Sequence, residues 1–198
     1  MAQVVPRPRL GGPQPLLDAA LEIVAERGTN ALTIRAVAER AGASPGTVSY
    51  HFDSSDDLLV EALEHGASRF AQDLERLALD LQDTDWDAGS WARAFAAALA
   101  HDVTERRVQH LACFELQLLA ARRPELRPAA ERVQFAYLRV ARMALGALGS
   151  RDVDTAAVRL VAMLTGLVLV ELVHQVAGAE ERLTTALLEA VSEHGFDS

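Results

Sequence analysis

A short polar segment near the start of the chain has side chains suited to contact with nucleic acid. It supplies two hydroxyls, a phenol and an imidazole within five residues, on Thr47, Ser49, Tyr50 and His51. In a helix, Val48 and Phe52 would point inward at i and i+4, which leaves the four polar groups on exposed faces. Such groups can hydrogen-bond to phosphates and base edges. The segment is therefore a candidate for sequence recognition.

The flanking residues predict two short helices joined by a tight turn. Thr33 can cap the first helix, because its hydroxyl accepts from backbone N–H groups at the helix start. One apolar stripe follows, formed by Ile34, Val37 and Ala38. Gly42 ends this helix, since glycine reaches the left-handed conformation without a Cβ clash. Ser44 caps the second helix and Pro45 takes its first position, where a missing N–H costs nothing.

This arrangement resembles the DNA-binding domain of the tetracycline-repressor (TetR) family over residues 15–59. The resemblance is carried by LLDAALEIVAERG at 16–28, LTIRAVAERAGASPGTVSYHF at 32–52 and SSDDLL at 54–59. It combines a preceding helix, the turn glycine, the Tyr-x-Phe ending and the following helix in the right order. The family implies a three-helix DNA-binding domain, here called the head (15–53), on an all-helical ligand-binding and dimerising domain, here called the body (54–198).

The resemblance also implies which residues contact a double-stranded operator. Thr47, Tyr50 and His51 are expected to carry most of the contact. The full expected set is Thr33, Arg35, Ser44, Gly46, Thr47, Ser49, Tyr50, His51 and Ser55. The family usually has a phosphate-contacting lysine where Ser55 stands, so this chain has one positive charge fewer there. Ser54 or Ser55 is expected to cap the fourth helix.

The composition is that of a helical protein with an uneven charge distribution. The chain has 198 residues, half of them hydrophobic, and all 19 basic residues are arginine. The net charge is −9, but residues 1–52 carry five Arg against four acidic residues. An acidic body repels DNA and would help to hold a duplex against the nearly neutral head. The alternative is that the acidic surface only keeps the protein soluble.

The body pattern predicts an all-α fold of about nine helices. Beyond the head, helices are expected over 55–81, 90–101, 108–122, 124–148, 152–176 and 180–194, with a short helix or turn up to 107. Acidic residues mark a loop over 82–89, and the first 14 residues, rich in proline, are expected to be a flexible arm.

Large apolar side chains at core spacing on several body helices predict a ligand pocket between the fourth and eighth helices. The expected ligand-binding residues are Phe70, Trp91, Phe95, Phe114 and Met163. Gly66 and Ala67 form a notch of small residues that would leave space for the ligand. Glu115 and Glu171 lie in apolar stretches and need partners, either an arginine such as Arg142 or Arg159, or a polar group on the ligand.

The sequence gives little support for an enzyme or a cofactor-binding protein. The sequence has no glycine-rich phosphate loop, no paired-cysteine metal spacing and no nucleophile elbow. His101, His110 and Glu115 could converge on a metal, but isolated histidines are usually not ligands, so no metal site and no cofactor are expected. The single cysteine, Cys113, excludes an intramolecular disulfide and fits a reducing cytoplasm. No signal peptide is expected, and the apolar run 160–170 is too short to span a membrane.

The two long late helices, 124–148 and 152–176, predict a homodimer. The second of them has apolar residues on nearly all sides, and a helix apolar all round is buried all round. One broad side comprises Val158, Val161, Ala162, Thr165, Leu169, Leu172 and Val176. Two heads related by a twofold axis would read a palindromic operator with half-sites about one helical turn apart.

These features favour a cytoplasmic transcription regulator, most simply a repressor released from its operator by a small apolar or amphipathic ligand. The alternative is a regulator without a small-molecule ligand, either constitutive or controlled by a protein partner. A cavity in the body would favour the first of these, and a solid core would favour the second.

Overall fold

The computed structural model describes residues 12–82, 87–174 and 178–193. Over these residues the chain forms nine α-helices, two short 3₁₀ helices and no strand, which confirms the all-α fold. The elements are α1 (Gln14–Arg27), η1 (Thr29–Ala31), α2 (Ile34–Arg40), α3 (Pro45–His51), α4 (Ser55–Gln82), α5 (Ala88–Glu105), α6 (Arg107–Ala120), η2 (Pro124–Leu126), α7 (Arg127–Ala147), α8 (Val153–His174) and α9 (Ala179–Glu193).

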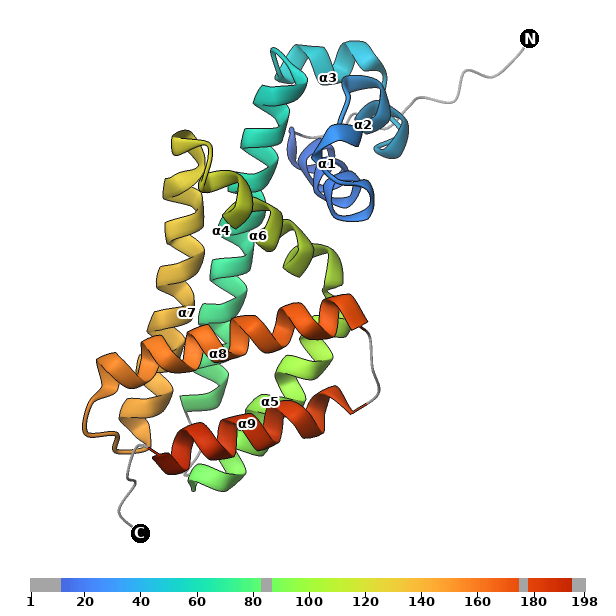
Figure 1. Cartoon of the computed structure of the whole chain (residues 1–198). Helices are drawn as coiled ribbons and strands as arrows, with labels where there is room; N and C mark the ends of the chain where they lie inside the picture. The colour runs from blue at the N-terminus through green and yellow to red at the C-terminus, as the bar shows by residue number, and fades with distance from the viewer. Residues whose placement is uncertain (1–11, 83–86, 175–177, 194–198) are drawn as a thin grey trace.

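The head and the body lie at opposite ends of one long helix. Figure 1 shows α1, α2 and α3 gathered at the top, with α4 running from them down through the body. The helix α7 packs along α4, and α5 and α9 pack together at the far end. The helix α8 packs against α7 and crosses the body. The single helix α4 therefore belongs to both parts.

Local capping holds the two motif helices in place, as the sequence predicts. The backbone N–H of Ala36 donates to Thr33 Oγ1 at 3.1 Å, and that of Thr47 donates to Ser44 Oγ at 3.0 Å. Gly42 has a φ of +65°, a backbone conformation that residues with a Cβ rarely adopt. The turn and the start of the second helix thus depend on residues within a dozen positions of one another.

The start of α4 is capped by Ser54 rather than Ser55. The backbone N–H of Asp57 donates to Ser54 Oγ at 3.0 Å, and the Asp57 carboxylate accepts from the backbone N–H of Asp53 at 3.0 Å. The Ser54 hydroxyl therefore caps α4, and the Asp57 side chain holds the residue that precedes the cap. Ser55 is then the first residue of the helix.

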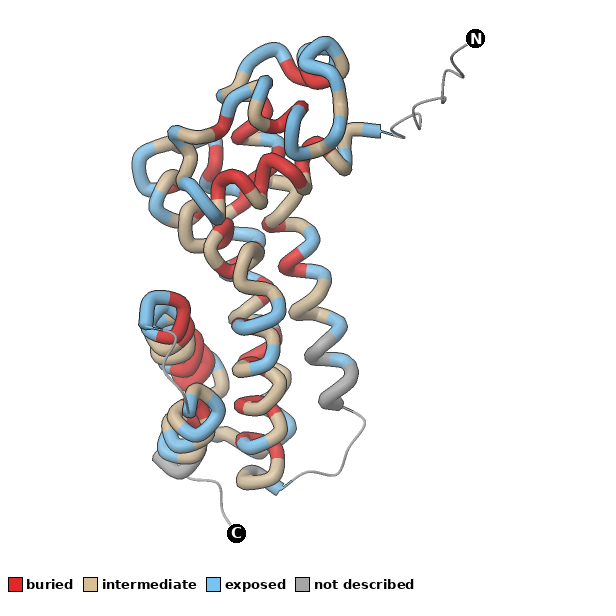
Figure 2. The backbone as a smooth tube through the Cα atoms, turned by 90° about the vertical axis from the view of Figure 1, so that its right-hand side faces the viewer, coloured by how far each residue is buried: buried red, intermediate tan, exposed pale blue. Residues whose placement is uncertain are grey.

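The buried side chains form two clusters that meet along α4. The first combines head residues with α4, α6 and the start of α7, and includes Ile23, Phe52 and Leu116. The second lies among α5, α7, α8 and α9, and includes Leu160 and Leu187. Figure 2 shows buried segments concentrated inside the head and along the inner sides of the long helices. The head therefore shares its core with α6 of the body.

Several predicted helix ends are wrong by a few residues. The fifth helix continues past 101 to Glu105, because no glycine or proline interrupts it. Pro124 opens the 3₁₀ helix η2, and α7 begins only at Arg127, followed by Pro128. The predicted arm up to residue 11, and residues 83–86 of the predicted loop, lie outside the described residues.

The helix α8 is unusually apolar. It is 22 residues long with a mean hydropathy of 2.1 over its most apolar 18-residue window, so by length and composition it could cross a membrane. Only 39% of that window is buried in the subunit. Core helices of soluble proteins meet the same criterion, and the inner side of α8 packs into the second core cluster.

Candidate functional site

The helix α3, which carries most of the expected contact residues, lies at the outer end of the head (Figure 1). Tyr50 is 84% exposed, and its ring meets that of His51 edge-to-face at 5.1 Å. Ser49 and Gly46 are exposed, whereas Thr47 is half-buried with its hydroxyl 2.9 Å from that of Ser44. Val48 is fully buried and holds this arrangement against the head core.

The supporting residues of the expected contact set surround this helix. Thr33 and Arg35 are exposed at the start of α2, and Ser44 is exposed at the start of α3. Ser55 begins α4 and is half-buried. The set therefore gathers around three helix N-termini, whose backbone N–H groups favour an anion such as phosphate.

Some charged side chains of the head, and one at the start of α4, form ion pairs within the molecule. Arg40 binds Glu22 at 2.9 Å and Glu26 at 2.6 Å, so it ties α2 to α1. Asp56, at the start of α4, receives two hydrogen bonds from Arg123 at 2.6 and 2.8 Å. These hydrogen bonds lower the pKa of Asp56 below its usual value. The negative charge that Asp56 would bring near a duplex is thus offset by an arginine.

A cavity lies between the helices α4 to α8, where the sequence predicts a pocket. Its volume is about 60 Å³, and its described lining is mainly apolar. The lining residues are Leu74, Trp91, Phe95, Leu99, Asp102, His110, Cys113, Phe114, Gln117, Tyr137, Val140, Ala141, Ala144, Leu160, Val161, Leu164, Thr165 and Val168. Burial raises the pKa of the Cys113 thiol to about 12, so this thiol stays protonated.

Three of the five predicted ligand residues reach this cavity, namely Trp91, Phe95 and Phe114. Phe70 instead lies behind the cavity wall, where its ring packs edge-on against His110 at 5.1 Å and Tyr137 at 5.6 Å. Met163 packs against the second core cluster without lining the cavity.

Gly66 and Ala67 do not line this cavity, so the expectation that they leave space for its ligand is wrong. A Cβ on Gly66 would lie 3.0 Å from Leu21 Cδ2 and 3.1 Å from Cδ1, because Leu21 of α1 packs against this position. Gly66 borders instead a separate hollow of about 350 Å³ between α1, α4 and α6, whose lining includes several charged residues. Ala67 is buried in the first core cluster. The small residues serve the close approach of α1 to α4, which the sequence of α4 alone could not reveal.

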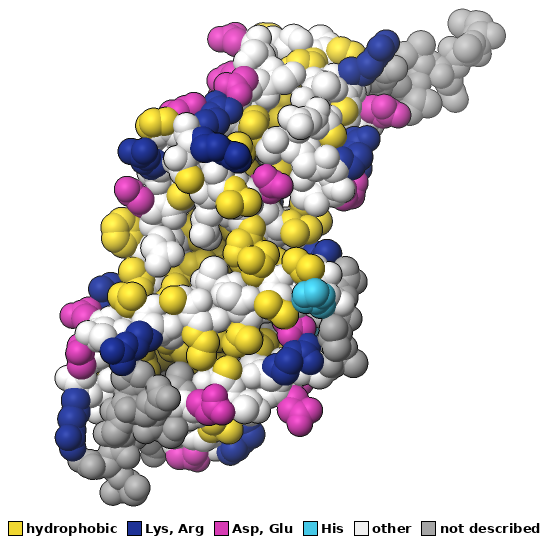
Figure 3. All heavy atoms as spheres, viewed as in Figure 1, with side chains coloured by type: hydrophobic (Ala, Val, Ile, Leu, Met, Phe, Trp, Pro, Cys, Tyr) yellow, Lys and Arg dark blue, Asp and Glu magenta, His cyan; other side chains and the backbone are white. Residues whose placement is uncertain are grey.

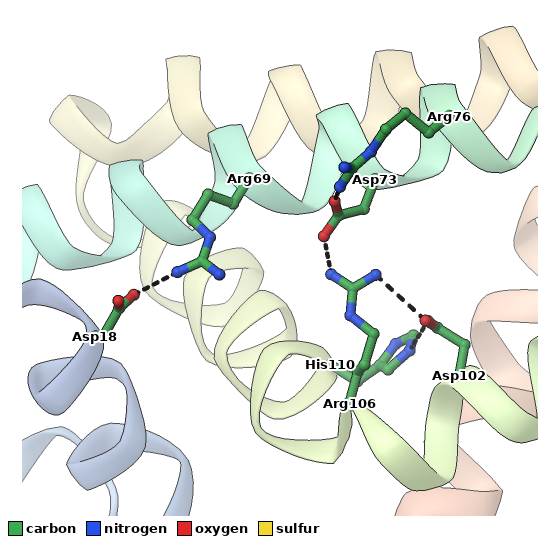
Figure 4. Close-up of polar contacts among 7 residues, drawn as sticks. All are labelled: Asp18, Arg69, Asp73, Arg76, Asp102, Arg106 and His110. Carbon is green, nitrogen blue, oxygen red and sulfur yellow. Dashed lines mark hydrogen bonds and ion pairs between the residues drawn. The ribbon is translucent and has the colours of Figure 1, made fainter. Parts of the chain in front are cut away.

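A polar network runs from the cavity to the surface of α4 (Figure 4). His110 is 2% exposed, and its Nε2 donates to Asp102 Oδ2 at 2.8 Å. Arg106 contacts Asp102 at 3.3 Å and also pairs with Asp73, which in turn pairs with Arg76. Burial raises the pKa of Asp102, but the His110 hydrogen bond and the neighbouring positive charges outweigh it, so the pKa is lowered. The Asp102 carboxylate therefore stays ionised.

The buried Glu171 has an arginine partner, although not one of the two suggested by the sequence. Its carboxylate accepts from Arg182 Nε at 2.8 Å and from Nη2 at 2.7 Å, which joins α8 to α9. Glu115 is half-buried outside the cavity lining. Among the described residues no cluster of His, Cys, Asp and Glu could hold a metal ion, so His101, His110 and Glu115 do not converge.

Two family models match the chain. Residues 16–62 match "Bacterial regulatory proteins, tetR family", and residues 86–193 match "Tetracyclin repressor-like, C-terminal domain". The second match alone covers more than half of the chain. The chain belongs to the TetR family. This is a family of transcription regulators rather than enzymes, and the helix-turn-helix of the head is its DNA-binding element.

Individual TetR relatives and solved structures agree with this assignment. The regulator BetI of Burkholderia thailandensis is 32% identical in an alignment of 115 positions that covers 48% of this chain and 58% of BetI. Alignments with the curated relatives span 24% to 58% of their lengths. The multidrug binding protein EbrR, solved with proflavin, is 30% identical over 89% of this chain and 98% of its own, with a TM-score of 0.63.

A regulator from Saccharomonospora viridis, solved with choline, shows the same fold. It has a TM-score of 0.74 at 20% identity over 93% of this chain and 97% of its own.

Sequence reasoning from the TetR resemblance missed the polar part of the cavity. Asp102, Arg106 and His110 are spaced four apart across the junction of α5 and α6, and this regular run of polar residues within apolar helices was the available signal. Tyr137 was missed as well, because one aromatic residue on a long helix does not show which side faces a cavity.

Proposed function

We propose that the protein is a dimeric repressor that leaves a palindromic DNA operator when a small apolar or amphipathic molecule fills the cavity. The observation that carries this proposal is the connection between the two sites through α6. Cys113 on α6 lines the cavity, and the same residue belongs to the core cluster that includes the head helix α1. A ligand that displaces α6 would therefore displace the head.

The cavity supports ligand control over the alternative of a regulator without a small-molecule ligand. An empty apolar cavity lowers the free energy of unfolding. A repressor without a small-molecule ligand would not need one, and here such a cavity is bounded by five helices. EbrR was solved with proflavin, and the Saccharomonospora viridis regulator was solved with choline. We infer that this chain also binds a ligand, because it has a cavity of its own.

The proposed dimer interface lies on the outer side of α8 and the adjoining part of α7. Its exposed apolar residues include Phe135 on α7 and Val158, Leu169 and Val173 on α8, which are 44% to 65% exposed. Ala162 and Gly166 are exposed between them and would allow close helix approach. Figure 3 shows hydrophobic side chains gathered across the middle of this face.

The structure changes which residues would meet the partner. Val161 and Leu172, placed on the broad outer side by the sequence pattern, are buried within the subunit at 5% and 1% exposure. Thr165 lines the cavity and donates to the Val161 carbonyl oxygen at 2.7 Å. Val176 lies outside the described residues. The interface that we propose is therefore a narrower stripe through Leu169.

The proposed division of labour places DNA contact in the head (15–53) and ligand binding and dimerisation in the body (54–198), with the protein acting in the cytoplasm, where the operator is found. Thr47, Tyr50 and His51 would read base edges, and Arg35 and the N-terminus of α4 at Ser55 would bind phosphates.

Selection of duplexes from a random-sequence library tests this function directly. We expect the purified protein to enrich one palindromic sequence with half-sites about one helical turn apart. The variant Tyr50→Ala, folded to the same extent by circular dichroism, is expected to enrich this sequence less strongly than the unmodified protein. A failure of the unmodified protein to enrich any sequence would overturn the proposal.

A further inference from the structure

The cavity has aromatic side chains contributed by three helices. Trp91 and Phe95 are one turn apart on α5, and their rings stack with centroids 5.1 Å apart and planes within 12°. Phe114 comes from α6 and Tyr137 from α7. Aromatic faces carry partial negative charge and attract cations, most strongly where water is excluded.

The cavity wall also includes one carboxylate, that of Asp102, and no arginine or lysine side chain lies beside it among the described lining residues. The partner of Asp102, Arg106, lies outside the lining and is held toward α4 by Asp73, as Figure 4 shows. Asp102 remains ionised because His110 and Arg106 hydrogen-bond to it. The ionised Asp102 carboxylate therefore lies on the cavity wall, whereas the arginine that pairs with it lies outside the lining.

The size of the cavity favours a compact ligand. Its volume of about 60 Å³ is far below the roughly 300–1,000 Å³ typical of pockets for drug-sized molecules. Most of the lining consists of hydrocarbon side chains, with few groups able to accept several N–H donors. A cation that carries methyl groups instead of N–H groups would leave no donor unsatisfied in such a place.

We propose that the ligand of this cavity is a compact organic monocation of the quaternary ammonium class, held by the aromatic walls and by the Asp102 carboxylate. This inference rests on the proposed function, because it names the chemical class of the ligand that releases the operator. Asp102 gives charge selectivity, and Trp91, Phe95, Phe114 and Tyr137 supply the contact surface.

Calorimetric titration of the full chain with choline and with its neutral isostere 3,3-dimethyl-1-butanol tests the proposal. The two molecules have nearly the same shape and differ in charge. We expect choline to bind at least about 10-fold more tightly, because a desolvated cation gains from both the rings and the carboxylate. Equal affinity for the two molecules, or no binding of choline up to 10 mM (roughly the affinity range that such small ligands reach), would overturn the proposal.

Two aspartate-to-asparagine variants test which carboxylate gives the preference for choline. Asp102→Asn removes the carboxylate charge that faces the cavity, and Asp73→Asn removes the other carboxylate that pairs with Arg106, outside the lining. We expect Asp102→Asn to abolish the preference for choline. Asp73→Asn keeps the cavity carboxylate but leaves Arg106 to pair with Asp102 alone, so we expect it to reduce the preference without abolishing it. Loss of the preference in both variants would assign the selectivity to the ion-pair network as a whole and overturn the role of Asp102.

A third variant covers the case in which Asp102→Asn fails to fold. Trp91→Leu keeps an apolar side chain in the cavity wall and removes a ring face, so we expect it to weaken choline binding about 10-fold. Unchanged choline affinity in this variant would contradict the aromatic contribution. If choline does not bind while another molecule, such as proflavin, releases the selected operator, this inference fails and the proposed function stands.

Discussion

The head and the body are built by different kinds of contact. In the head, the proposed recognition helix α3 is positioned by residues close to it in sequence, through the caps at Thr33 and Ser44 and the turn at Gly42. In the body, the cavity is lined from five helices spread over residues 74–168. Removing one side chain from the head surface changes one contact, whereas removing one from the cavity changes the packing of several helices.

This difference explains where each region tolerates change. The proposed recognition surface faces solvent, with Tyr50 84% exposed, so its side chains can be changed with little effect on the free energy of folding. The cavity wall includes His110 at 2% exposure and Trp91 at 5%, so its chemistry is tied to stability. Ligand specificity is therefore expected to change through coordinated substitutions, and operator specificity through single ones.

The largest loss of operator affinity is expected from a change in the proposed dimer interface of the body, because dimerisation brings two heads onto one operator. Arginine at both Leu169 and Val173 would place two charges in the apolar interface stripe, so the variant should be a monomer in sedimentation. A monomer engages one half-site, so we expect roughly a 1,000-fold loss of operator affinity in a fluorescence anisotropy titration.

Leu118→Arg is the matched control for the dimer prediction. Leu118 is an exposed leucine, 62% accessible, on α6 rather than on the α7 and α8 face. This variant should remain a dimer with unchanged operator affinity. A monomeric unmodified protein at micromolar concentration would contradict the proposed interface.

Smaller effects are expected from single substitutions in the head, and they distinguish a side chain that contacts DNA from one that positions α3. Tyr50→Ala should weaken operator binding by about 1–3 kcal/mol while leaving the free energy of unfolding unchanged, because the ring is exposed. Ser44→Ala should destabilise the head by about 1 kcal/mol, because the Thr47 N–H loses its cap. Urea denaturation followed by circular dichroism, combined with operator titration, distinguishes the two. A destabilised Tyr50→Ala variant would show that Tyr50 has a structural role.

The smallest effect is expected at the junction of head and body. Gly66→Ala places a Cβ about 3.0 Å from Leu21, which has to shift by a few tenths of an ångström, so we expect a loss of about 1 kcal/mol in the free energy of unfolding. The response to ligand should remain, because Gly66 does not line the cavity. Loss of the ligand response without loss of stability would instead support the pocket notch predicted from the sequence.

Part of the cavity was predictable and part was not, for a physical reason. Trp91, Phe95 and Phe114 could be predicted because large apolar side chains at helical spacing must be buried somewhere. Phe70 satisfies the same rule but packs behind the wall against Tyr137, because burial alone does not specify which neighbour covers a side chain. Glu171 needed an arginine, but the choice of Arg182 over Arg142 or Arg159 depends on how α9 docks on α8.

By itself, the sequence determined the all-α fold, the two caps, the turn and the polar outer surface of α3, because each depends on residues within a few turns of one another. Only the tertiary structure decided that Leu21 packs against Gly66, and that Asp102 faces the cavity while Arg106 is drawn toward Asp73. These outcomes depend on how helices distant in sequence cross. Such crossings are set by the summed packing of many side chains, which no single segment specifies.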